Sequence, residues 1–345
     1  MDMDSLLRAH GVGVGKKIQP SIIPIFSGFN GSTDSNLREI VSKSDRTVFG
    51  MATISSAQKL CGFAPISQKL FENTVGANQH SLMLSPDETK LFIYYRDGSN
   101  NTFLGQVNMT TGALTRTDSI GAIDQHFIVL VDESYDVYLF NHANRQLIKR
   151  TRDGNGFYTA NAWVVTLAGS NASLMWHHLV RFSDGTFALP IFDSGTSRVT
   201  MNYISAAGAL TGQPSPSFAT TGAVGHCIPD PSDKSFYCID NSTRELVKVN
   251  SSGGTVWRCN FGGASQTGYA FIGVRKGHVY LWVNNTNGHN KIIKVNTSSG
   301  GIVHTMAAIT TVGGTADVNA AKNHNPLITK IMPLYSQPFL GWIQD

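Results

Sequence analysis

Histidine is the residue whose recurrence in this sequence points most directly to chemistry. Five histidines return at intervals, each at the start of an apolar segment: His80, His126, His177, His226 and His324. Imidazole nitrogens bind transition metals, and protonated imidazoles bind anions. If the apolar segments are strands around a common axis, these side chains would form a ring able to hold a metal or an anion. The alternative, which the regular recurrence favours, is that each histidine ties a turn to its own strand.

Carboxylates are the second group capable of chemistry, because hydrolysis needs paired acids or a nucleophile beside its base. Most acids lie in turns, where an aspartate normally caps its own backbone. The turn acids include Asp87, Glu88, Asp132, Glu133, Asp184, Asp230 and Asp233. The segment FSDGTF (182–187) partly matches the sialidase Asp box, S-x-D-x-G-x-T-W, but its Ser and Asp are adjacent and it occurs once. The sequence therefore singles out no catalytic residue, predicts no cofactor and favours a non-enzymatic protein, while leaving catalysis open.

The cysteines have no spacing typical of a metal site. The four are Cys61, Cys227, Cys238 and Cys259, without a C-x-x-C pair among them. We expect reduced, buried side chains. Cys227 and Cys238 are placed to face each other across a hairpin, where a disulfide is feasible but not required.

The elements that must position these groups are short strands in a repeated order. LSPDETKLFIYY (84–95) contains an apolar end, a polar turn and a run of β-branched and aromatic residues. A second turn, a strand, a third turn and a last strand follow up to residue 121. The same order returns in four further segments, 129–157, 179–210, 227–257 and 272–303. The repeating unit is therefore a group of four strands joined by turns.

The glycines of the third turn measure the period. Gly112, Gly154, Gly208, Gly254 and Gly301 are separated by 42, 54, 46 and 47 residues. Four strands in a period of this length predict the blade of a β-propeller. One such sheet cannot bury both of its faces alone, so blades stack around an axis. The glycines are expected to adopt positive φ.

The two ends of the chain predict how the ring closes. Residues 46–66 resemble the third and fourth strands of the first full unit, and residues 324–345 resemble an opening pair of strands. We interpret them as one composite blade that removes the free edges of the ring. The prediction is an all-β propeller of six four-stranded blades over residues 46–345. The alternative is seven blades, with SIIPIFSG (21–28) and LREIVS (37–42) as inner strands.

Residues 1–45 lie outside the repeats in this interpretation. They carry apolar side chains whose exposure to water would cost about 25 cal/mol per Å². These are Leu6, Leu7, Ile22, Ile23, Ile25 and Phe26. We expect the segment to be an arm that packs on the ring or on a neighbouring subunit and so serves assembly.

The segment LSPDETKLFIYYRDGSNNTFLGQVNMTTGAL (84–114) resembles the repeats of YVTN and lactonase-like β-propellers, which read S-P-D-G, a strand with Tyr, and T-x-T-G. Glu88 stands where glycine is usual, and the resemblance extends over about 77–306. It implies the propeller fold. Lactonase-like enzymes hold a divalent metal with Glu, Asn and Asp around the axis, but no residue here is picked out for that role. Gly225-His226 resembles the structural Gly-His pair of WD repeats.

Composition bounds the partners. Only 14% of residues are charged, the net charge is +4, and no basic cluster indicates nucleic acid or a membrane surface. The N-terminus, with Asp2 and Asp4 and no long apolar core, does not resemble a signal peptide. Low charge and Ser/Thr/Asn/Gly-rich strands resemble bacteriophage virion components. The leading hypothesis is a non-enzymatic structural or adaptor propeller of a phage tail. It would bind other virion proteins or its own copies, and be made in the host cytoplasm.

Two other classes of function remain open. One is a lactonase-like, metal-dependent hydrolase. The other is a receptor- or glycan-binding module, in which exposed tryptophans would be the anchors. The candidates are Trp163, Trp176, Trp257 and Trp282. Against this reading, propeller tryptophans more often pack between blades.

Overall fold

The structure is a computed structural model in which every described element is a β-strand. It describes residues 21–27, 35–43, 45, 47–54, 57–64, 69–75, 78–121, 126–154, 156, 158, 160–168, 172–174, 179–193, 198–211, 217–219, 227–240, 243–261, 266–275, 277–285, 289–310, 318–320, 327–332 and 337–344. Within these ranges there is no helix, so no described helix could cross a membrane. The predicted all-β class is confirmed.

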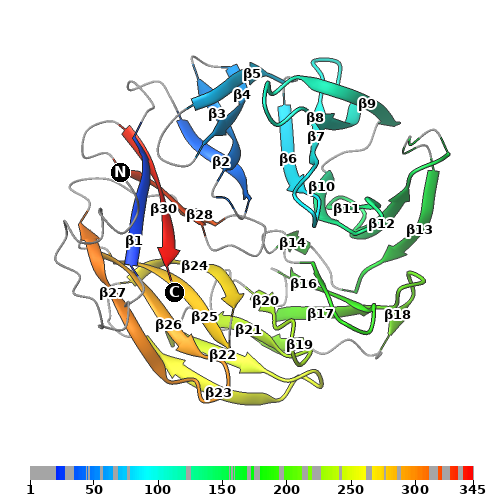
Figure 1. The fold of residues 1–345 in the computed structure, drawn as a ribbon. Coiled ribbons are helices and arrows are strands. Elements are labelled where there is room, and N and C mark those ends of the chain that lie inside the picture. The colour runs from blue at the N-terminus through cyan, green and yellow to red at the C-terminus, as the bar shows by residue number, and fades with distance from the viewer. Residues whose placement is uncertain are drawn as a thin grey trace.

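The described strands form seven antiparallel sheets that follow one another around a ring (Figure 1). Six of the sheets are built from strands that follow one another in the sequence. The first of these contains β2 (Ser35–Ser42), β3 (Val48–Ile54), β4 (Ala57–Phe63) and β5 (Lys69–Thr74). The next contains β6 (Asn78–Leu84), β7 (Leu91–Arg96), β8 (Thr102–Val107) and β9 (Leu114–Gly121). The third contains β10 (His126–Val131), β11 (Val137–Asn141), β12 (Gln146–Thr151) and β13 (Ala160–Thr166).

The chain continues around the ring in the same way. A six-stranded sheet contains β14 (Ala172–Leu174), β15 (Val180–Arg181), β16 (Phe187–Asp193), β17 (Arg198–Ile204), β18 (Leu210–Thr211) and β19 (Ser217–Ala219). It is followed by β20 (Cys227–Pro229), β21 (Phe236–Asp240), β22 (Glu245–Val249) and β23 (Thr255–Asn260). The next contains β24 (Gln266–Arg275), β25 (His278–Asn285), β26 (His289–Asn296) and β27 (Ile302–Thr310). This ring of small sheets is a β-propeller.

The remaining sheet joins the two ends of the chain. Its order is β1 (Ser21–Ser27), β30 (Gln337–Gln344), β29 (Leu327–Met332) and β28 (Val318–Ala320). Strand β1 pairs with residues 339–344 of β30, with Ser21 opposite Gln344 and Ser27 opposite Phe339. The N-terminal segment therefore supplies one edge strand to a sheet built otherwise from the C-terminus.

Three expectations about the ends differ from this arrangement. Residues 46–66 were expected as third and fourth strands beside the C-terminus, but β3 and β4 are the second and third strands of the β2–β5 sheet. The sequence favoured six blades, whereas the described residues form seven sheets, because β2 opens a sheet of its own. The range 1–45 was placed outside the propeller, yet it contains β1 and β2. A chain starting at Arg46 would lack both strands.

Middle strands are apolar on both sides because each sheet packs between two others. All five residues of β11 and all five of β21 are buried, whereas six of the seven residues in the outer strand β13 are partly or fully exposed. Phe140 on β11 and Phe187 on β16 share one core cluster between neighbouring sheets. Continuous apolar runs in the second strands follow from this two-sided burial.

Aromatic side chains of one sheet pack on turn glycines of the next. A Cβ atom at Gly112 would lie 2.2 Å from the Phe71 ring, at Gly208 2.4 Å from the Trp163 ring and at Gly300 2.7 Å from the Trp257 ring. The three glycines also have φ of +70°, +80° and +71°. Positive φ was correctly expected at Gly112 and Gly208. In the other units it falls instead on Gly156, Gly253 and Gly300 rather than on Gly154, Gly254 and Gly301.

Replacing Gly208 with alanine should lower the free energy of unfolding by about 3 kcal/mol, because the left-handed backbone and the Trp163 contact both oppose a Cβ. Gly185→Ala is the matched control. Gly185 has φ of +81°, but the nearest atom to its Cβ would be 3.9 Å away, so only the backbone cost of about 1 kcal/mol applies. Chemical denaturation measures both. Equal losses would contradict the ring-on-glycine contact.

Removing residues 1–27 should lower the melting temperature more than removing residues 1–20. The longer deletion removes β1 and leaves the backbone of β30 as an unpaired edge, which also favours self-association. Deleting 340–345 should do the most damage, since β30 pairs with both β1 and β29. Circular dichroism melts and size-exclusion chromatography measure these effects. The same melting temperature for the 1–20 and 1–27 deletions would show that β1 is dispensable.

Candidate functional site

The histidine ring is only partly within the described part of the chain. His80 lies on β6 and His126 begins β10, and both strands are the first in their sheets, as the repeat predicted. Their side chains, and the whole of His177, His226 and His324, lie outside what the structure describes. The ring therefore stays a prediction. For the arm, Ile22, Ile23, Ile25 and Phe26 lie on β1, and Leu6 and Leu7 fall outside the described residues.

Several of the described acids lie at the turns between the first and second strands of successive sheets. As expected, the turn aspartates first cap their own backbone. Asp132 Oδ1 accepts hydrogen bonds from the amides of Ser134 (3.0 Å) and Asp136 (2.9 Å). Asp184 Oδ1 accepts one from the amide of Thr186 at 3.0 Å. These carboxylates, which a hydrolase would use for catalysis, therefore stabilise the backbone of their own turns.

One position in each of these turns is left-handed. It is occupied by Glu88, Tyr135, Gly185, Lys234 and Gly277, whose φ values are 57°, 63°, 81°, 60° and 73°. Glu88 thus adopts the conformation of the glycine that it replaces in the S-P-D-G pattern. A left-handed conformation costs a residue with a Cβ about 1–2 kcal/mol. A compensating interaction is therefore expected wherever a larger side chain occupies the position.

Two of these left-handed residues reach back to the preceding sheet. Tyr135 OH donates a hydrogen bond of 2.6 Å to Asp87, which lies 48 residues earlier. Lys234 Nζ donates one of 2.6 Å to Asp184, 50 residues earlier. Arg181 of the β14–β19 sheet pairs with Glu133 of the β10–β13 sheet, across the boundary that lies between the other two. We name these contacts between consecutive turns the inter-sheet bridges.

Hydrogen bonds from their own turns and from the bridges hold Asp87 and Asp184 in their charged form. Hydrogen bonds from Ser85, Tyr135 and Thr89 keep the pKa of Asp87 well below its usual range. Those from Lys234 and Thr186 do the same for the pKa of Asp184. A carboxylate with so low a pKa is a poor proton donor or acceptor near neutral pH. These acids are consequently suited to binding their neighbours and not to acid–base catalysis.

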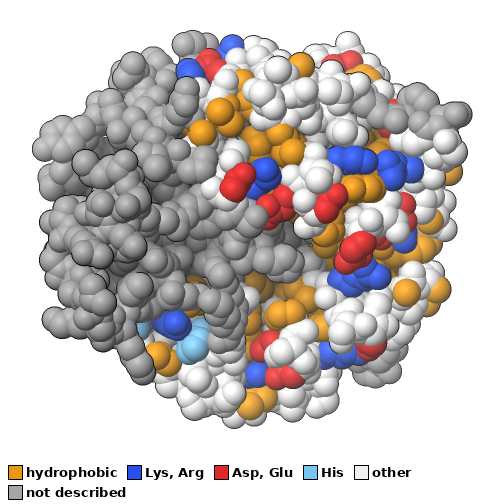
Figure 2. All heavy atoms as spheres, in the orientation of Figure 1, with side chains coloured by type: hydrophobic (Ala, Val, Ile, Leu, Met, Phe, Trp, Pro, Cys, Tyr) orange, Lys and Arg blue, Asp and Glu red, His pale blue; other side chains and the backbone are white. Residues whose placement is uncertain are grey.

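Basic side chains cover the ring of Tyr135. Lys90 Nζ lies 3.7 Å from the ring centroid, and the Arg152 guanidinium lies 4.8 Å from it. Partial burial, and then the charge of Arg152, lower the pKa of Lys90. On the face shown in Figure 2 basic and acidic side chains lie next to each other and do not form patches of one sign. Such a surface does not steer a strongly charged ligand.

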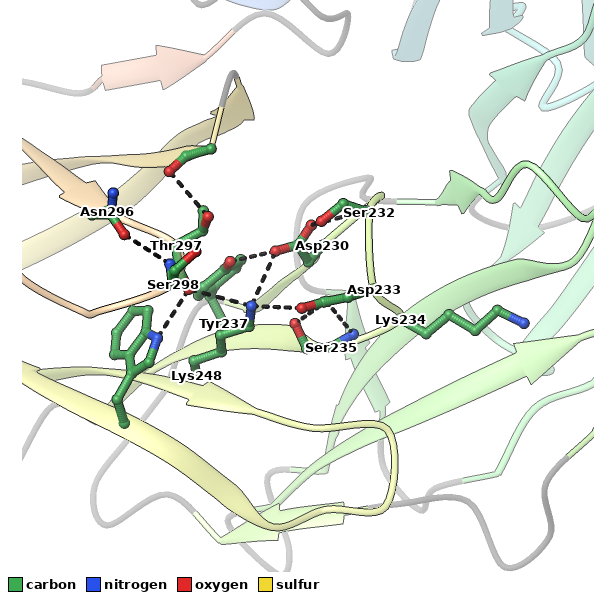
Figure 3. A network of polar contacts seen from close by, with 12 residues as sticks. Asp230, Ser232, Asp233, Lys234, Ser235, Tyr237, Lys248, Asn296, Thr297 and Ser298 are labelled. Atoms are coloured by element: carbon green, nitrogen blue, oxygen red, sulfur yellow. Dashed lines mark hydrogen bonds and ion pairs between the residues drawn. The ribbon is translucent and has the colours of Figure 1, made fainter.

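A buried network joins the β20–β23 sheet to the next one (Figure 3). Lys248 Nζ lies 2.7 Å from Asp233 Oδ2 and 3.5 Å from Asp230 Oδ2. Tyr237 OH donates to Asp230, and burial together with that contact raises the pKa of Tyr237. Lys248 also donates to the carbonyl of Thr297 at 3.3 Å, in the turn of the following sheet.

The same arrangement occurs two sheets earlier. Lys149 Nζ lies 2.9 Å from Asp136 and 3.6 Å from Asp132, and Tyr138 OH donates to Asp132 at 3.0 Å. Burial raises the pKa of Tyr138 to about 12. Burial opposes the charge on Lys149, but its hydrogen bonds with Asp136 and Tyr138 raise its pKa overall.

Cross-strand register explains why the network repeats. Tyr138 lies directly opposite Lys149, Tyr237 opposite Lys248, and Tyr280 opposite Lys294. Sequence reasoning missed these pairs, although the 11-residue spacing shared by the first two was a usable signal. The pairs lie on the second and third strands, where burial leaves each lysine dependent on a carboxylate or an aromatic ring.

Two of the four candidate tryptophans are engaged between sheets. Trp163 packs on Gly208 and contacts the rings of Tyr138 and Phe187. Trp257 packs on Gly300, and its Nε1 donates to the carbonyl of Thr297 at 3.0 Å. The packing interpretation is therefore confirmed for this pair. Trp176 and the side chain of Trp282 lie outside the described residues.

Among the described residues, no group of three His, Cys, Asp or Glu side chains is arranged to hold a metal ion. The described cysteines are free thiols. What the described geometry supplies is a series of charge-assisted and aromatic contacts between consecutive sheets. Those contacts can position the surfaces of neighbouring sheets relative to each other.

Comparisons with known proteins support the fold. No protein-family model and no curated protein matches the chain. A protein from Lactobacillus plantarum is similar in structure over 90% of this chain and 91% of its own, with a TM-score of 0.53 and 14% identity. The Dos1 propeller matches over 89% of this chain and 78% of its own, with a TM-score of 0.54 and 8% identity. BBS1N, solved in complex with ARL6DN, matches over 92% and 96%, with a TM-score of 0.55 and 8% identity.

The Tyr135–Asp87 bridge can be measured by a double-mutant cycle with Tyr135→Phe and Asp87→Asn. Since both groups are near the surface, we expect a coupling energy of about 0.5–1 kcal/mol. Asp97→Asn is the control, because the described hydrogen bonds of the Asp97 carboxylate are with Asn101 and Ser99 of its own turn. Coupling of Tyr135 to Asp97 as large as its coupling to Asp87 would contradict the bridge.

The coupling should also depend on pH. The pKa of Asp87 is lower in the folded state than its ordinary value, so its stabilisation is present above that ordinary value, about 4. It should be lost as pH falls below about 4, where the carboxylate becomes protonated in the unfolded chain first. A coupling energy that rises in acid would contradict the assignment.

Proposed function

We propose that this propeller is a non-enzymatic structural or adaptor component of a larger assembly. The proposal rests on the observation that the turn carboxylates form hydrogen bonds within and between sheets. The carboxylates of Asp87, Asp184 and Asp230 each accept a hydrogen bond from a side chain of the same or a neighbouring sheet. The ring is therefore a scaffold whose outer surfaces are available to partners. Propellers serve as binding platforms as well as enzymes, and BBS1N provides an example in its complex with ARL6DN.

The outer strands supply surface of the right kind for such contacts. Four of them expose large apolar side chains to between 40% and 55% of their area, namely Leu70 on β5, Val164 on β13, Val256 on β23, and Ile302 and Val303 on β27. Only 14% of the residues in the chain are charged. Apolar, weakly charged surfaces favour protein contacts over nucleic acid or highly anionic membranes.

The finer proposal is that the assembly is a bacteriophage virion, with the protein in its tail. Its partners would be other virion proteins or copies of itself, with no nucleic acid and no membrane among them. It would be made in the host cytoplasm and incorporated into the particle. The support is compositional: low charge, and strands rich in Ser, Thr, Asn and Gly.

Fractionation of particles tests the proposal. Particles from the source cells are separated on a density gradient, and an antibody to this protein is used on every fraction. The proposal predicts that the protein bands with particles and that gentle disruption releases it with a constant set of neighbours. Protein found only in the soluble fraction would reject the virion role. Turnover of a lactone by the purified chain, dependent on an added divalent metal, would instead support the hydrolase alternative.

A further inference from the structure

Cys227 and Cys238 lie directly opposite each other on β20 and β21. Opposite residues of an antiparallel pair share one face of the sheet, so both side chains point the same way. The Cys238 thiol is one of the groups that raise the pKa of Cys227, and both side chains belong to one core cluster. The arrangement expected from the spacing of these cysteines is therefore present, with both sulfur atoms as free thiols.

The hydrogen-bond pattern of the hairpin identifies the kind of pair they form. The amide of Asp230 donates to the carbonyl of Ser235 at 2.7 Å, which makes that pair a hydrogen-bonded one. Hydrogen-bonded and non-hydrogen-bonded pairs alternate along an antiparallel ladder. The next pair contains Pro229, which has no amide hydrogen, and Phe236. Two steps further along, Cys227 and Cys238 are therefore a non-hydrogen-bonded pair.

Such pairs meet the geometric requirement for a disulfide. Cα atoms of non-hydrogen-bonded pairs lie about 4.5 Å apart, and disulfides span Cα distances of roughly 4.4–6.8 Å. Hydrogen-bonded pairs, with their side chains further apart, are less suited. No change in strand register is needed to bring the two sulfur atoms of this pair to bonding distance.

We propose that Cys227 and Cys238 are a reversible oxidation site, in which a small peroxide or a low-molecular-weight disulfide converts the two thiols into a cross-strand disulfide. With hydrogen peroxide, one thiolate attacks a peroxide oxygen, giving a sulfenic acid and one molecule of water once the proton is taken up. The second thiol displaces the sulfenic hydroxyl, forming the S–S bond and releasing a second water. Two thiols are oxidised by two electrons, and the peroxide is reduced.

Burial sets the rate of this reaction. Both cysteines are fully buried in the core cluster between the β14–β19 and β20–β23 sheets, beside Phe236 and Met201. Burial, and then the neighbouring thiol, raise the pKa of Cys227 well above its ordinary value, so thiolate is scarce in the closed protein. Oxidation should therefore be slow in the folded state and faster when the hairpin opens locally.

The disulfide would matter most to β20. Cys227 is the first residue of the described part of this strand, and three described pairs, the last of them Pro229 with Phe236, join it to β21. A covalent link at Cys227 would restrict opening of the hairpin, because closing a loop removes entropy from the open state. Oxidation would therefore stabilise the pairing of β20, the first strand of this sheet, with β21.

Peptide mapping of the full-length protein tests the proposal without any substitution. Trypsin cleaves after Arg198, Lys234 and Arg244, so residues 199–234 carry Cys227 and residues 235–244 carry Cys238. After treatment with hydrogen peroxide, these two peptides should appear as one linked species that separates on reduction. Of the four thiols of the denatured chain, only those of Cys61 and Cys259 should remain reactive. Linkage should form faster at a low, non-denaturing urea concentration.

Substitutions and melting curves add independent readouts. Cys238→Ala should abolish linkage at Cys227, whereas Cys61→Ala, at a buried cysteine of a different sheet, should leave linkage intact. The oxidised protein should melt several degrees above the reduced one, and reductant should remove the difference. Sulfinic or sulfonic acid at Cys227 without linkage, or linkage only to Cys61 or Cys259, would overturn the proposal. So would a lower melting temperature for the linked form.

Discussion

A sheet of four short strands has two apolar faces, and everything else in this structure depends on covering both of them. The second strands show the requirement directly, since β11 and β21 are buried along their whole length. No sheet can meet that requirement alone, so each must lie between two others, and the row must close on itself. The pairing of β1 with β30 joins the beginning of the described chain to its end.

Once the faces are covered, the turns of neighbouring sheets must also be held in line, and polar side chains hold them. The bridges Tyr135–Asp87 and Lys234–Asp184 connect equivalent turns about one repeat apart. Trp163 and Trp257 lie on the glycines of the next sheet. Groups that would attract attention as catalytic or ligand-binding residues are thus occupied in aligning the ring. This is why we place the function of the protein on its outer surface.

Periodicity alone predicted the four-stranded unit, the propeller class and the left-handed Gly112 and Gly208. It misassigned residues 46–66, because successive hairpins of one blade have similar patterns and a single hairpin does not reveal which strands it contains. The opening strand β2 lacks the S-P-D turn that marks its counterpart β6. The Tyr–Lys pairs depend on cross-strand register. Their shared spacing of 11 residues could have indicated Tyr138–Lys149 and Tyr237–Lys248, whereas the spacing of 14 in Tyr280–Lys294 hid the third pair.

The central claim is that the buried polar network serves stability, and the unfolding free energy of Lys248→Met tests it most directly. Removing the ammonium leaves the buried Asp230 carboxylate without its cation, and we predict a loss of about 3 kcal/mol. Lys69→Met, which breaks the exposed pair with Glu72, should cost less than about 1 kcal/mol. Functional sites are often built at the expense of stability. An unchanged or increased unfolding free energy for Lys248→Met would therefore contradict the account and identify the network as a site for chemistry or ligand binding.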